Sequence, residues 1–567
     1  MFRNAFRNGL SLNHGKCRAT HFPLLFHFGF KRARPMVVNQ RWISGPPTPN
    51  QQNPSPIDDV APESSSSSDG GGWKGTTFKM FESAVTTFAS IAMLGLVGYS
   101  YTQYYKYLVL EKIENAFRPG DPVLELAAHV KQVPPGDIPG TGEDYDRWIP
   151  RDEQLKLDAI VCGESGGHYH LLIGEKGTGK SSMLIDAMSK IDGEGVAMFE
   201  AHADLEIFRV RLGKALDFEF HEDNIGSLFS IRGPRDASAL LDIERAFNKL
   251  EKVALKRRKT VGRPLVLIIN SVHLLRDDDD GRDLLELIQQ RAEQWAASNL
   301  VTVVFNSDDY WVYERLKQNA ARMEVTPVGD LQKDRALQAL ANYRMKYFNE
   351  QTPPETLEKV YDKIGGRLTY LNRVAKSKDM ISMCDHICDT EKTWFLNQCW
   401  ILGEEMDDDV MDQQKFASAA MVLAKALVDK EKEMESIYHH ETGHILPEIP
   451  LHEARQIMTR ADFIKSYDHI NVFTIDSRAM VRADSVPMQN AFREICSEGG
   501  FDEHLEATLE RISAIESLGR TRELTIKDLW NGGKYKITAR NSKGNVDKDL
   551  TFEVLPGKKD DDDEDGV

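Results

Sequence analysis

The hydrophobic residues of this chain gather in short continuous runs that are separated by longer stretches with helical spacing. Three runs, at 169–173, 265–269 and 300–305, are apolar at almost every position, as strands are when helices cover both faces of a parallel sheet. A polar stretch with helical spacing, at 237–258, lies between the first two. This alternation predicts an α/β fold, with a doubly wound parallel sheet over residues 151–330.

A different pattern precedes this region. Residues 83–105 contain no charged side chain, and Glu82 and Lys106 bound the run. At 1.5 Å per residue such a helix is long enough for a hydrocarbon core of about 30 Å. We expect one transmembrane helix over 77–106, followed by a connector at 107–150. Because Thr, Ser and Gly dilute the run, a buried helix of a soluble domain is the alternative, and the orientation in the membrane stays open.

The distribution of charge adds an interpretation of the N-terminus. The 567 residues include 71 Lys and Arg and 88 Asp and Glu, a formal net charge of −17, yet no acidic residue precedes Asp58. An arginine-rich, acid-free segment predicts a mitochondrial presequence at 1–43, with Arg41 placed for cleavage before Ser44. A basic disordered arm is the alternative. Residues 44–76, rich in Pro, Gln, Ser and Gly, predict a flexible linker. A presequence followed by one span indicates a single-pass protein of the inner mitochondrial membrane.

The first apolar run is followed at once by a phosphate-binding motif. Residues 174–181 fit G-x-x-x-x-G-K-[ST] without a mismatch, between a predicted strand and a predicted helix. Backbone N–H groups close around the phosphates, Lys180 reaches the β- and γ-phosphates, and the Ser181 hydroxyl ligates Mg²⁺. A glycine-rich turn that fits by chance is the alternative. We expect ATP and Mg²⁺ as cofactors, held by Gly174, Glu175, Lys176, Gly177, Thr178, Gly179, Lys180, Ser181 and Ser182.

The acidic residues that an active ATPase needs are missing from the next strand. The run at 265–269 ends in Asn270 and Ser271, where hydrolysis requires an Asp in the Mg²⁺ shell and a Glu that polarises the attacking water. Asn270 retains the ability to hydrogen-bond a metal-bound water. Ser271 cannot act as a base at neutral pH. The sequence therefore predicts nucleotide binding, with Asn270 in the site, and weak hydrolysis.

Over residues 160–377 the chain resembles the AAA+ P-loop ATPases of the archaeal-ATPase and origin-recognition-complex-like branch. The resemblance rests on the P-loop, on a strand at 322–328 that contains a proline, and on a Gly-Gly-Arg sequence at 365–367. Leu368 stands where the family has a proline. The resemblance implies an AAA+ core over 151–330 and a helical lid over 331–400.

The same resemblance implies roles for three further residues. Asn306, which ends the run at 300–305, corresponds to the sensor of the γ-phosphate. Arg367 is the candidate second sensor, and Arg322 is the candidate arginine finger that acts on a neighbouring subunit. A finger of this kind implies a homo-oligomer. For the arginines, an ordinary surface or helix-capping role is the alternative.

The C-terminal third predicts a winged-helix domain over 405–515. Its signals are a helix at 416–434, short helices at 451–458 and 461–469, and a hairpin at 472–483. Residues 516–567 are expected to form a β-hairpin and an acidic tail.

The expected recognition helix of this domain is almost neutral. Arg460 and Lys465 are balanced by Asp462 and Asp468, whereas a DNA-binding helix needs a basic face. The acidic run at 560–565 would repel nucleic acid further. We therefore favour a protein partner or an intramolecular contact for the winged helix over duplex binding.

A second motif competes with this interpretation. His440, Glu441 and His444 satisfy H-E-x-x-H, and such a motif after an ATPase region invites comparison with the FtsH-like zinc proteases. Zinc chemistry needs both histidines on one helix face with the glutamate as base. Gly443, Pro447 and Pro450 disfavour that helix, so a loop is the preferred interpretation.

The sequence thus predicts an ATP-binding AAA+ protein of the inner mitochondrial membrane that acts as a nucleotide-dependent switch, scaffold or chaperone-like ATPase with weak hydrolysis. One alternative is an ATP-dependent nucleic-acid factor of the mitochondrial nucleoid. A further alternative is the zinc protease.

Overall fold

The computed structural model describes residues 74–120, 123–124, 151–218, 238–401, 411–522, 533–540, 546–553 and 555. The expected presequence, most of the linker, most of the connector and the acidic run at 560–565 lie outside the described residues. The chain divides into two compact units, Met1–Glu82 and Ser83–Val567. The sheets, the lid and the winged helix all belong to the second unit.

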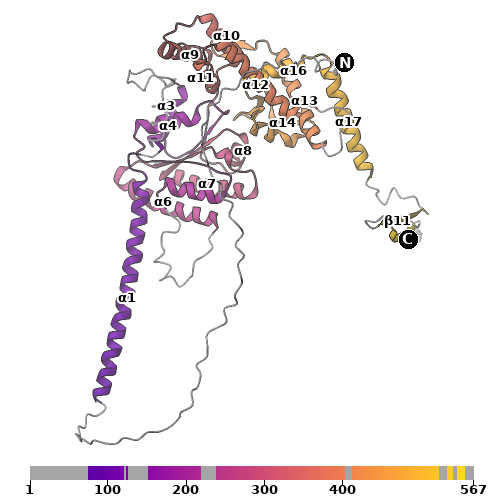
Figure 1. The fold of residues 1–567 in the computed structure, drawn as a ribbon. Helices are drawn as coiled ribbons and strands as arrows, with labels where there is room; N and C mark the ends of the chain where they lie inside the picture. Colours follow the sequence, from indigo (N-terminus) through magenta and orange to yellow (C-terminus); the bar gives the residue numbers. More distant parts are fainter. Residues whose placement is uncertain are drawn as a thin grey trace, which may run out of the picture. The chain divides into compact units, whose positions relative to one another are not determined.

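One long helix, α1 (Lys74–Asn115), contains the charge-free run. Its part from Met80 to Asn115 is long and apolar enough to cross a membrane, judged by length and composition. The expected apolar helix is therefore confirmed as a candidate span. Figure 1 shows the C-terminal end of α1 meeting the rest of the fold. Val109 and Ile113 of this end, and Phe117 in the turn that follows it, are buried in the main hydrophobic core. The spacing of four residues places Val109 and Ile113 on one helix face.

The ATPase core is a five-stranded parallel sheet in the order β2-β3-β4-β1-β5. Nearly every residue of β1 to β4 is buried, since helices cover both faces, and this explains why β1, β3 and β4 are continuous apolar runs in the sequence. The residues of β5, at the edge of the sheet, are mostly half-buried. The expected doubly wound α/β fold is confirmed. The strands are β1 (Tyr169–Ile173), β2 (Val196–Glu200), β3 (Leu265–Asn270), β4 (Val301–Ser307) and β5 (Met323–Pro327).

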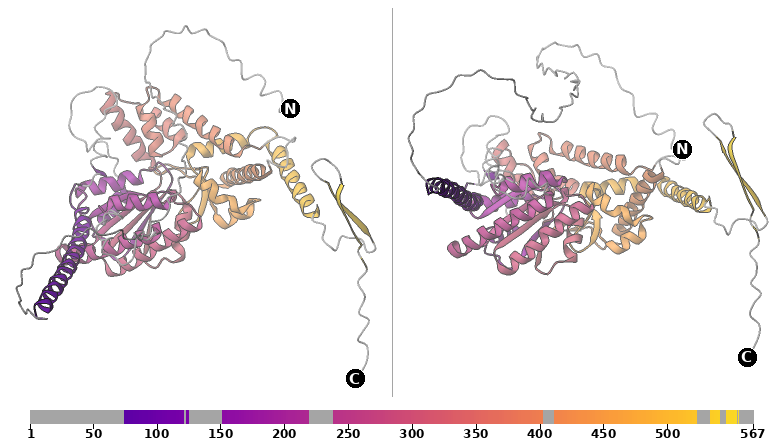
Figure 2. Two further views of the ribbon diagram at one scale, coloured as in Figure 1. Left: turned by 60° about the horizontal axis from the view of Figure 1, so that its bottom comes forward. Right: turned by 90° about the horizontal axis from the view of Figure 1, so that it is seen from below.

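Successive strand residues point to opposite faces of the sheet, and a different set of helices covers each face. Leu172 and Ile268 pack against α3 (Asp152–Val161) and α4 (Lys180–Lys190). Leu171 and Leu267 belong to the core on the other face. Figure 2 shows helices on both faces of the sheet. The helices there are α5 (Leu205–Ala215), α6 (Ala239–Val261), α7 (Asp279–Ser298) and α8 (Tyr310–Gln318). A short 3-10 helix, η3 (Val272–Leu274), follows β3.

The lid is a bundle of four helices with its own hydrophobic core, to which Leu340, Val360, Val374 and Ile387 each contribute one fully or almost fully buried side chain. Pro353 precedes α10, and Asp379 caps α12 by accepting hydrogen bonds from two backbone N–H groups. The helices are α9 (Lys333–Phe348), α10 (Pro354–Ile364), α11 (Leu368–Lys376) and α12 (Met380–Cys399).

The winged helix is built around a small antiparallel sheet in the order β8-β10-β9, so this part of the expected fold is confirmed. Its core includes Tyr467, Phe473 and Phe492. Its elements are α13 (Met411–Glu433), β6 (Tyr438–His439), β7 (Gly443–His444), β8 (Ile449–Pro450), α14 (Leu451–Ile457), η5 (Ala461–Phe463), α15 (Ile464–His469), β9 (Phe473–Ile475), β10 (Met480–Ala483), α16 (Val486–Cys496) and α17 (Phe501–Arg522). Beyond it, β11 (Lys534–Arg540) and β12 (Val546–Glu553) form an antiparallel hairpin.

Candidate nucleotide-binding site

The loop between β1 and α4 has the geometry of a phosphate cradle. Gly177 and Gly179 have φ angles of 84° and 98°, in the left-handed region that side chains rarely adopt. A Cβ at Gly174 would lie 2.0 Å from the backbone oxygen of Val328. Helix α4 begins at Lys180, directly after Gly179, so its first N–H groups, which have no acceptor within the helix, face the loop.

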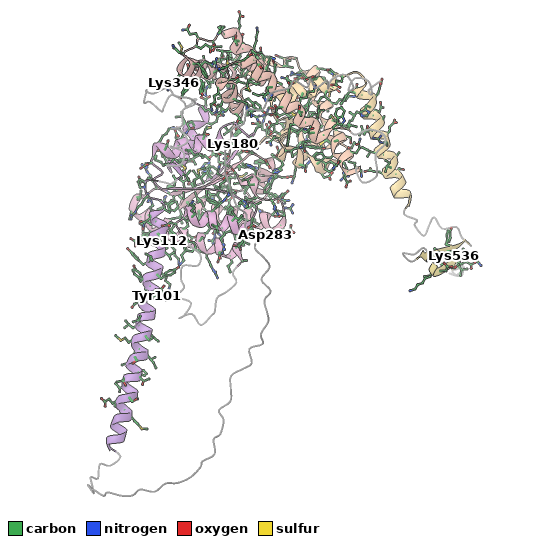
Figure 3. All side chains as sticks on the ribbon, viewed as in Figure 1. Tyr101, Lys112, Lys180, Asp283, Lys346 and Lys536 are labelled. Carbon is green, nitrogen blue, oxygen red and sulfur yellow. The ribbon has the colours of Figure 1, made fainter. Side chains whose placement is uncertain are left out.

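Lys180 is buried within this loop, and Figure 3 shows where it lies in the core. Its ammonium donates to the backbone oxygens of Gly174 and Glu175, both at 2.8 Å. It also forms an ion pair with Asp308, with Nζ and Oδ1 2.8 Å apart. Phosphate oxygens would compete with Asp308 for this ammonium. Asp308 lies two residues after the predicted sensor Asn306, and sequence reasoning missed it.

Three predicted residues from three different elements meet beside the lysine. The Ser181 hydroxyl donates to Asn270 Oδ1 at 2.9 Å, and the Asn306 amide donates to Ser181 Oγ at 3.1 Å. The other side-chain atom of Asn306, Oδ1, is buried without a hydrogen-bond partner among the described residues. Hydroxyl and amide oxygens are suitable Mg²⁺ ligands or acceptors for its bound waters. The residues present therefore fit ATP·Mg, with Lys180 and the loop amides for phosphate and Ser181 for the metal.

The end of β3 differs from an active hydrolytic site in structure as well as in sequence. Ser271 has a φ of 54°, in the left-handed region, and its hydroxyl donates to Glu200 Oε1 at 3.3 Å. Glu200 ends β2 and lies opposite Asn270 in the sheet. The carboxylate beside the position of the missing base thus comes from a neighbouring strand, and no sequence signal distinguished it from other residues that end strands.

Arg367 joins the lid to the P-loop and to the winged helix. Its guanidinium is buried and donates to Asp330 Oδ1 at 2.6 Å and to Asp484 Oδ2 at 3.0 Å. It also donates to the backbone oxygen of Lys176 at 3.0 Å. The predicted second sensor therefore does lie at the P-loop, but two carboxylates already bind its charge.

A second arginine reaches the P-loop from the winged helix. Arg482, on β10, donates to the carboxylate of Glu175, which is 5% exposed. Burial by itself would raise the pKa of Glu175, but Arg482 and Arg367 outweigh that effect and lower it. Burial also raises the pKa of Asp484, here to about 6, against the opposing effect of Arg367. We call Glu175, Asp330, Arg367, Arg482 and Asp484 the buried charge network.

Comparison with known proteins agrees with this geometry. Residues 147–304 match the family model described as an AAA ATPase domain. Residues 397–516 match the model of the fungal AAA protein C-terminal winged helix domain. The chain carries an AAA ATPase domain and a winged-helix domain. No curated protein matches it.

Solved structures of archaeal ATPases are similar to the chain at low identity. The Walker-type ATPase of Pyrococcus abyssi is 12% identical, with a TM-score of 0.40, over 63% of this chain and 99% of that one. The ORC2 protein of Aeropyrum pernix, solved with ADPNP and ADP, is 11% identical with a TM-score of 0.34, over 66% and 98%. The ORC1 protein of the same organism, solved in complex with DNA, is 14% identical with a TM-score of 0.31, over 62% and 94%.

Arg322 lies far from the nucleotide site of its own AAA domain. It is exposed and directly precedes β5, which runs parallel to β1. The P-loop follows the opposite end of β1, so Arg322 stands at the other edge of the sheet. This position excludes a role in its own site, and the expected action on a neighbouring subunit stays a prediction.

The H-E-x-x-H motif does not form a zinc site. Its residues lie on the β6–β7 hairpin rather than on a helix, and Gly443 has a φ of 89°. The His444 ring stacks on Tyr361 of the lid at a centroid distance of 5.5 Å, and burial lowers the pKa of His444. Among the described residues, no group of three His, Cys, Asp or Glu side chains could hold a metal ion. The zinc-protease alternative is therefore wrong for this motif. It requires both histidines on one face of a helix, and the motif forms a hairpin instead.

Proposed function

We propose that this chain is an ATP-binding switch of the inner mitochondrial membrane, in which nucleotide at the P-loop controls how the winged helix is held. The single observation that carries the proposal is the buried charge network. Glu175 belongs to the phosphate-binding loop, whereas its partner Arg482 belongs to the winged helix. Arg367 connects the same loop to Asp484. A change in the loop can therefore reach the winged helix through two contacts, Glu175–Arg482 and Arg367–Asp484.

The charge of the nucleotide gives this connection a direction. ATP supplies a triphosphate whose negative charge would enter a loop that already contains Glu175 and borders Asp308. Like charges at short range raise each other's energy, most strongly where water is excluded. Added phosphate charge thus favours a rearranged network, in which Glu175 and Arg482 no longer keep their present pairing.

Slow turnover follows from the same site. Asn270 hydrogen-bonds to Ser181 and Asn306 without contributing negative charge, and Ser271 cannot accept a proton from water at neutral pH. A protein that binds ATP and hydrolyses it slowly holds one conformational state for a long time. That behaviour suits a switch or a scaffold better than a motor.

The contacts of the winged helix support an intramolecular role. In its short helix α15, the Asp468 carboxylate accepts a hydrogen bond from the backbone N–H of Tyr310 at 2.7 Å, and Lys465 pairs with Glu314 at 2.7 Å. His469 contacts Asp309 at 2.7 Å, and this contact raises the pKa of His469. These partners all belong to the AAA domain, so the helix expected to read DNA is engaged with protein.

Location and assembly complete the proposal. The apolar part of α1 and the acid-free segment at 1–43 support a single-pass protein of the inner mitochondrial membrane, cleaved near Ser44. The exposed Arg322 is compatible with a homo-oligomer in which it reaches a neighbouring P-loop. Release of the mature chain into a carbonate supernatant would contradict the membrane assignment.

Hydrogen exchange of the full chain in detergent tests the switch. ATP·Mg should change the exchange of β9 and β10 in the wild type, because the network that holds them rearranges. Arg482→Gln should bind ATP but lose this response, and Lys180→Ala should show neither binding nor response. Tight ATP binding that alters exchange only in the P-loop and α4 would sink the proposal. Salt-dependent retention of the wild type on DNA would instead favour the nucleoid factor.

A further inference from the structure

The C-terminal end of α1 packs into the AAA domain. Tyr107 is 59% exposed, whereas Val109, half a turn later, is 4% exposed and belongs to the core. The backbone oxygen of Phe117 accepts hydrogen bonds from the N–H of Gly195, at 3.0 Å, and from Arg257, at 3.3 Å. The helix is therefore embedded in the domain within about one turn of Lys106, the charged end of the apolar run.

This short separation fixes the depth of the domain relative to a bilayer. Val109 lies three positions after Lys106, which is about 5 Å along a helix. The headgroup layer on each side of the hydrocarbon core is of about the same thickness. The part of the AAA domain that packs against Val109 therefore lies at the level of the lipid headgroups, provided that α1 spans the membrane as proposed above.

Helix α6 forms the surface next to α1, and its contact with Glu114 lies eight positions, about 12 Å, beyond Lys106. The Lys256 ammonium pairs with Glu114 of α1 at 2.6 Å, and Figures 1 and 2 show α6 beside the end of α1. Charge also links the two helices, since burial lowers the pKa of Lys249, and Lys252 and Lys106 add repulsion that lowers it further. Lys106, at the end of the span, is thus close to the cations of α6.

The composition of this surface is unusual for so acidic a chain. Residues 249–263 contain a single acidic side chain, Glu251, and seven basic ones. Leu255 and Val261 are 45% and 48% exposed among these cations, a mixture typical of helices that lie at a membrane interface. The basic residues are Lys249, Lys252, Lys256, Arg257, Arg258, Lys259 and Arg263.

The cations of this surface differ in their ion pairs with the described residues. Lys256 and Arg257 form ion pairs with Glu114 and Glu194. Lys252, Lys259 and Arg263 are exposed, and none of the residues that the structure describes forms an ion pair with them. A cluster of four to eight Lys and Arg next to a transmembrane helix is the composition that binds anionic lipid.

We infer that the C-terminal half of α6, with the exposed Lys252 and Lys259, together with Arg263 just after the helix, is a docking site for the anionic phospholipid headgroups of the membrane that α1 crosses. The inference rests on the proposed span. The complementary charge, the exposed apolar side chains and the attachment of α1 all select a lipid surface as the occupant. Docking would hold the AAA domain against the bilayer in one orientation.

Labelling of the full chain in lipid nanodiscs tests this inference. Lys252 and Lys259 should react with an amine reagent about fivefold more slowly when phosphatidylglycerol is added to phosphatidylcholine, which is the gain expected per cation near an anionic surface. High salt should remove the protection. The exposed Lys359 of the lid provides an internal reference and should react equally in both discs.

Charge reversal provides the second measurement. In Lys252→Glu/Lys259→Glu/Arg263→Glu the backbone exchange of α6 should no longer respond to phosphatidylglycerol. The control Lys359→Glu/Lys376→Glu/Lys378→Glu, which reverses three exposed cations of the lid and its end, should respond as the wild type does.

The outcomes separate the span from the docking site. A chain that remains in both kinds of disc but labels equally in them would overturn the docking site and leave the span intact. A chain that does not remain in neutral discs would overturn both. Protection of Lys252 and Lys259 by duplex DNA, and not by anionic lipid, would replace the lipid surface with nucleic acid and also overturn the inference.

Discussion

The two sides of the candidate nucleotide site differ in how well they match the residues that an active ATPase needs. The loop after β1 keeps every residue of the phosphate-binding motif, and its Lys180 is buried among three acceptors. The end of β3 keeps its place in the sheet, but Asn270 and Ser271 replace the acidic pair that hydrolysis uses. Asn270 hydrogen-bonds to Ser181 and Asn306. The side chains of the site are therefore held together although the acidic pair is absent.

The residues predicted to bind phosphate and those predicted to govern turnover thus follow separate strands, β1 and β3. The acidic side chains near the site now lie elsewhere. Asp308 pairs with the P-loop lysine, and Glu175 pairs with Arg482 of the winged helix. The carboxylate of Glu175 thus takes part in a contact between domains, whereas that of Asp308 takes part in a contact within the AAA domain.

The largest effect should come from Lys180→Ala. The variant removes the cation that would meet the β- and γ-phosphates and leaves Asp308 with its longer contact to His273, at 3.7 Å. Charged hydrogen bonds are worth about 1.5–3 kcal/mol each, so losing two of them should weaken ATP binding by about 10²-fold or more. Titration with a fluorescent ATP analogue measures the change. Lys176→Ala, which removes an exposed cation of the same loop, is the control, and an unchanged Kd in Lys180→Ala would show that the cradle is not the binding site.

The next largest effect should be on the rate of ATP hydrolysis, when the residues at the end of β3 are changed. Wild-type kcat should lie below about 1 s⁻¹, the lower end of the usual range for enzymes. Asn270→Asp/Ser271→Glu should raise it by about 10²-fold, because general base catalysis typically contributes 10²–10⁴-fold. Steady-state phosphate release measures both proteins, and Ser271→Ala is the control without an added base.

An opposite result would be informative about a specific residue. Wild-type hydrolysis at ordinary rates, abolished by Lys180→Ala, would mean that another side chain polarises the water. Glu200 is then the first candidate, since its carboxylate is bound to Ser271. Reduced turnover in Glu200→Gln would identify Glu200, at the end of β2, as the catalytic base in place of a residue at the end of β3.

The strands and the residues at their ends could be predicted from the sequence, because both depend on the local pattern of apolar and polar residues. The strands are buried on both faces and are therefore visible as apolar runs. Parallel strands bring their carboxyl ends to one edge of the sheet, so Ser181, Asn270 and Asn306 were expected at one site, and they do meet there.

The buried charge network could not be predicted in the same way. Arg482 and Asp484 lie more than 300 positions after the P-loop, and their hairpin has an ordinary alternation of buried and half-buried residues. That pattern does not indicate which residues Arg482 and Asp484 contact. The lid position of Arg367 was expected from the family resemblance, but its capture by Asp330 and Asp484 depends on the packing of three separate parts of the chain.

A third prediction measures how firmly the winged helix is held to the P-loop. Arg482→Ala leaves the buried Glu175 carboxylate without its partner, and removal of one member of a buried pair typically costs about 3–5 kcal/mol. The variant should therefore lower the Tm for loss of structure in the winged helix by several degrees. Arg478→Ala, which removes an exposed arginine of the same hairpin, should change stability by less than about 1 kcal/mol. Equal Tm shifts in the two variants would show that the Arg482–Glu175 contact stabilises the winged helix no more than an exposed ion pair does.

The smallest effect is a pH dependence centred on Asp484. Burial raises its pKa to about 6, above the ordinary value of 3.8, so the folded protein binds this proton more tightly than the unfolded chain. The stability contributed by the protonated carboxyl is complete below pH 3.8 and is lost as the pH rises through about 6. Asp484→Asn has no such loss, so its Tm relative to that of the wild type should increase between pH 4 and pH 7, as followed by circular dichroism. Asp462→Asn is the matched control, because Arg460 lowers the pKa of that exposed carboxyl, and its Tm relative to the wild type should stay constant over the same interval. If the Asp484→Asn difference is also constant, Asp484 is ionised throughout, and the link between the lid and the winged helix is a fixed ion pair that does not respond to pH.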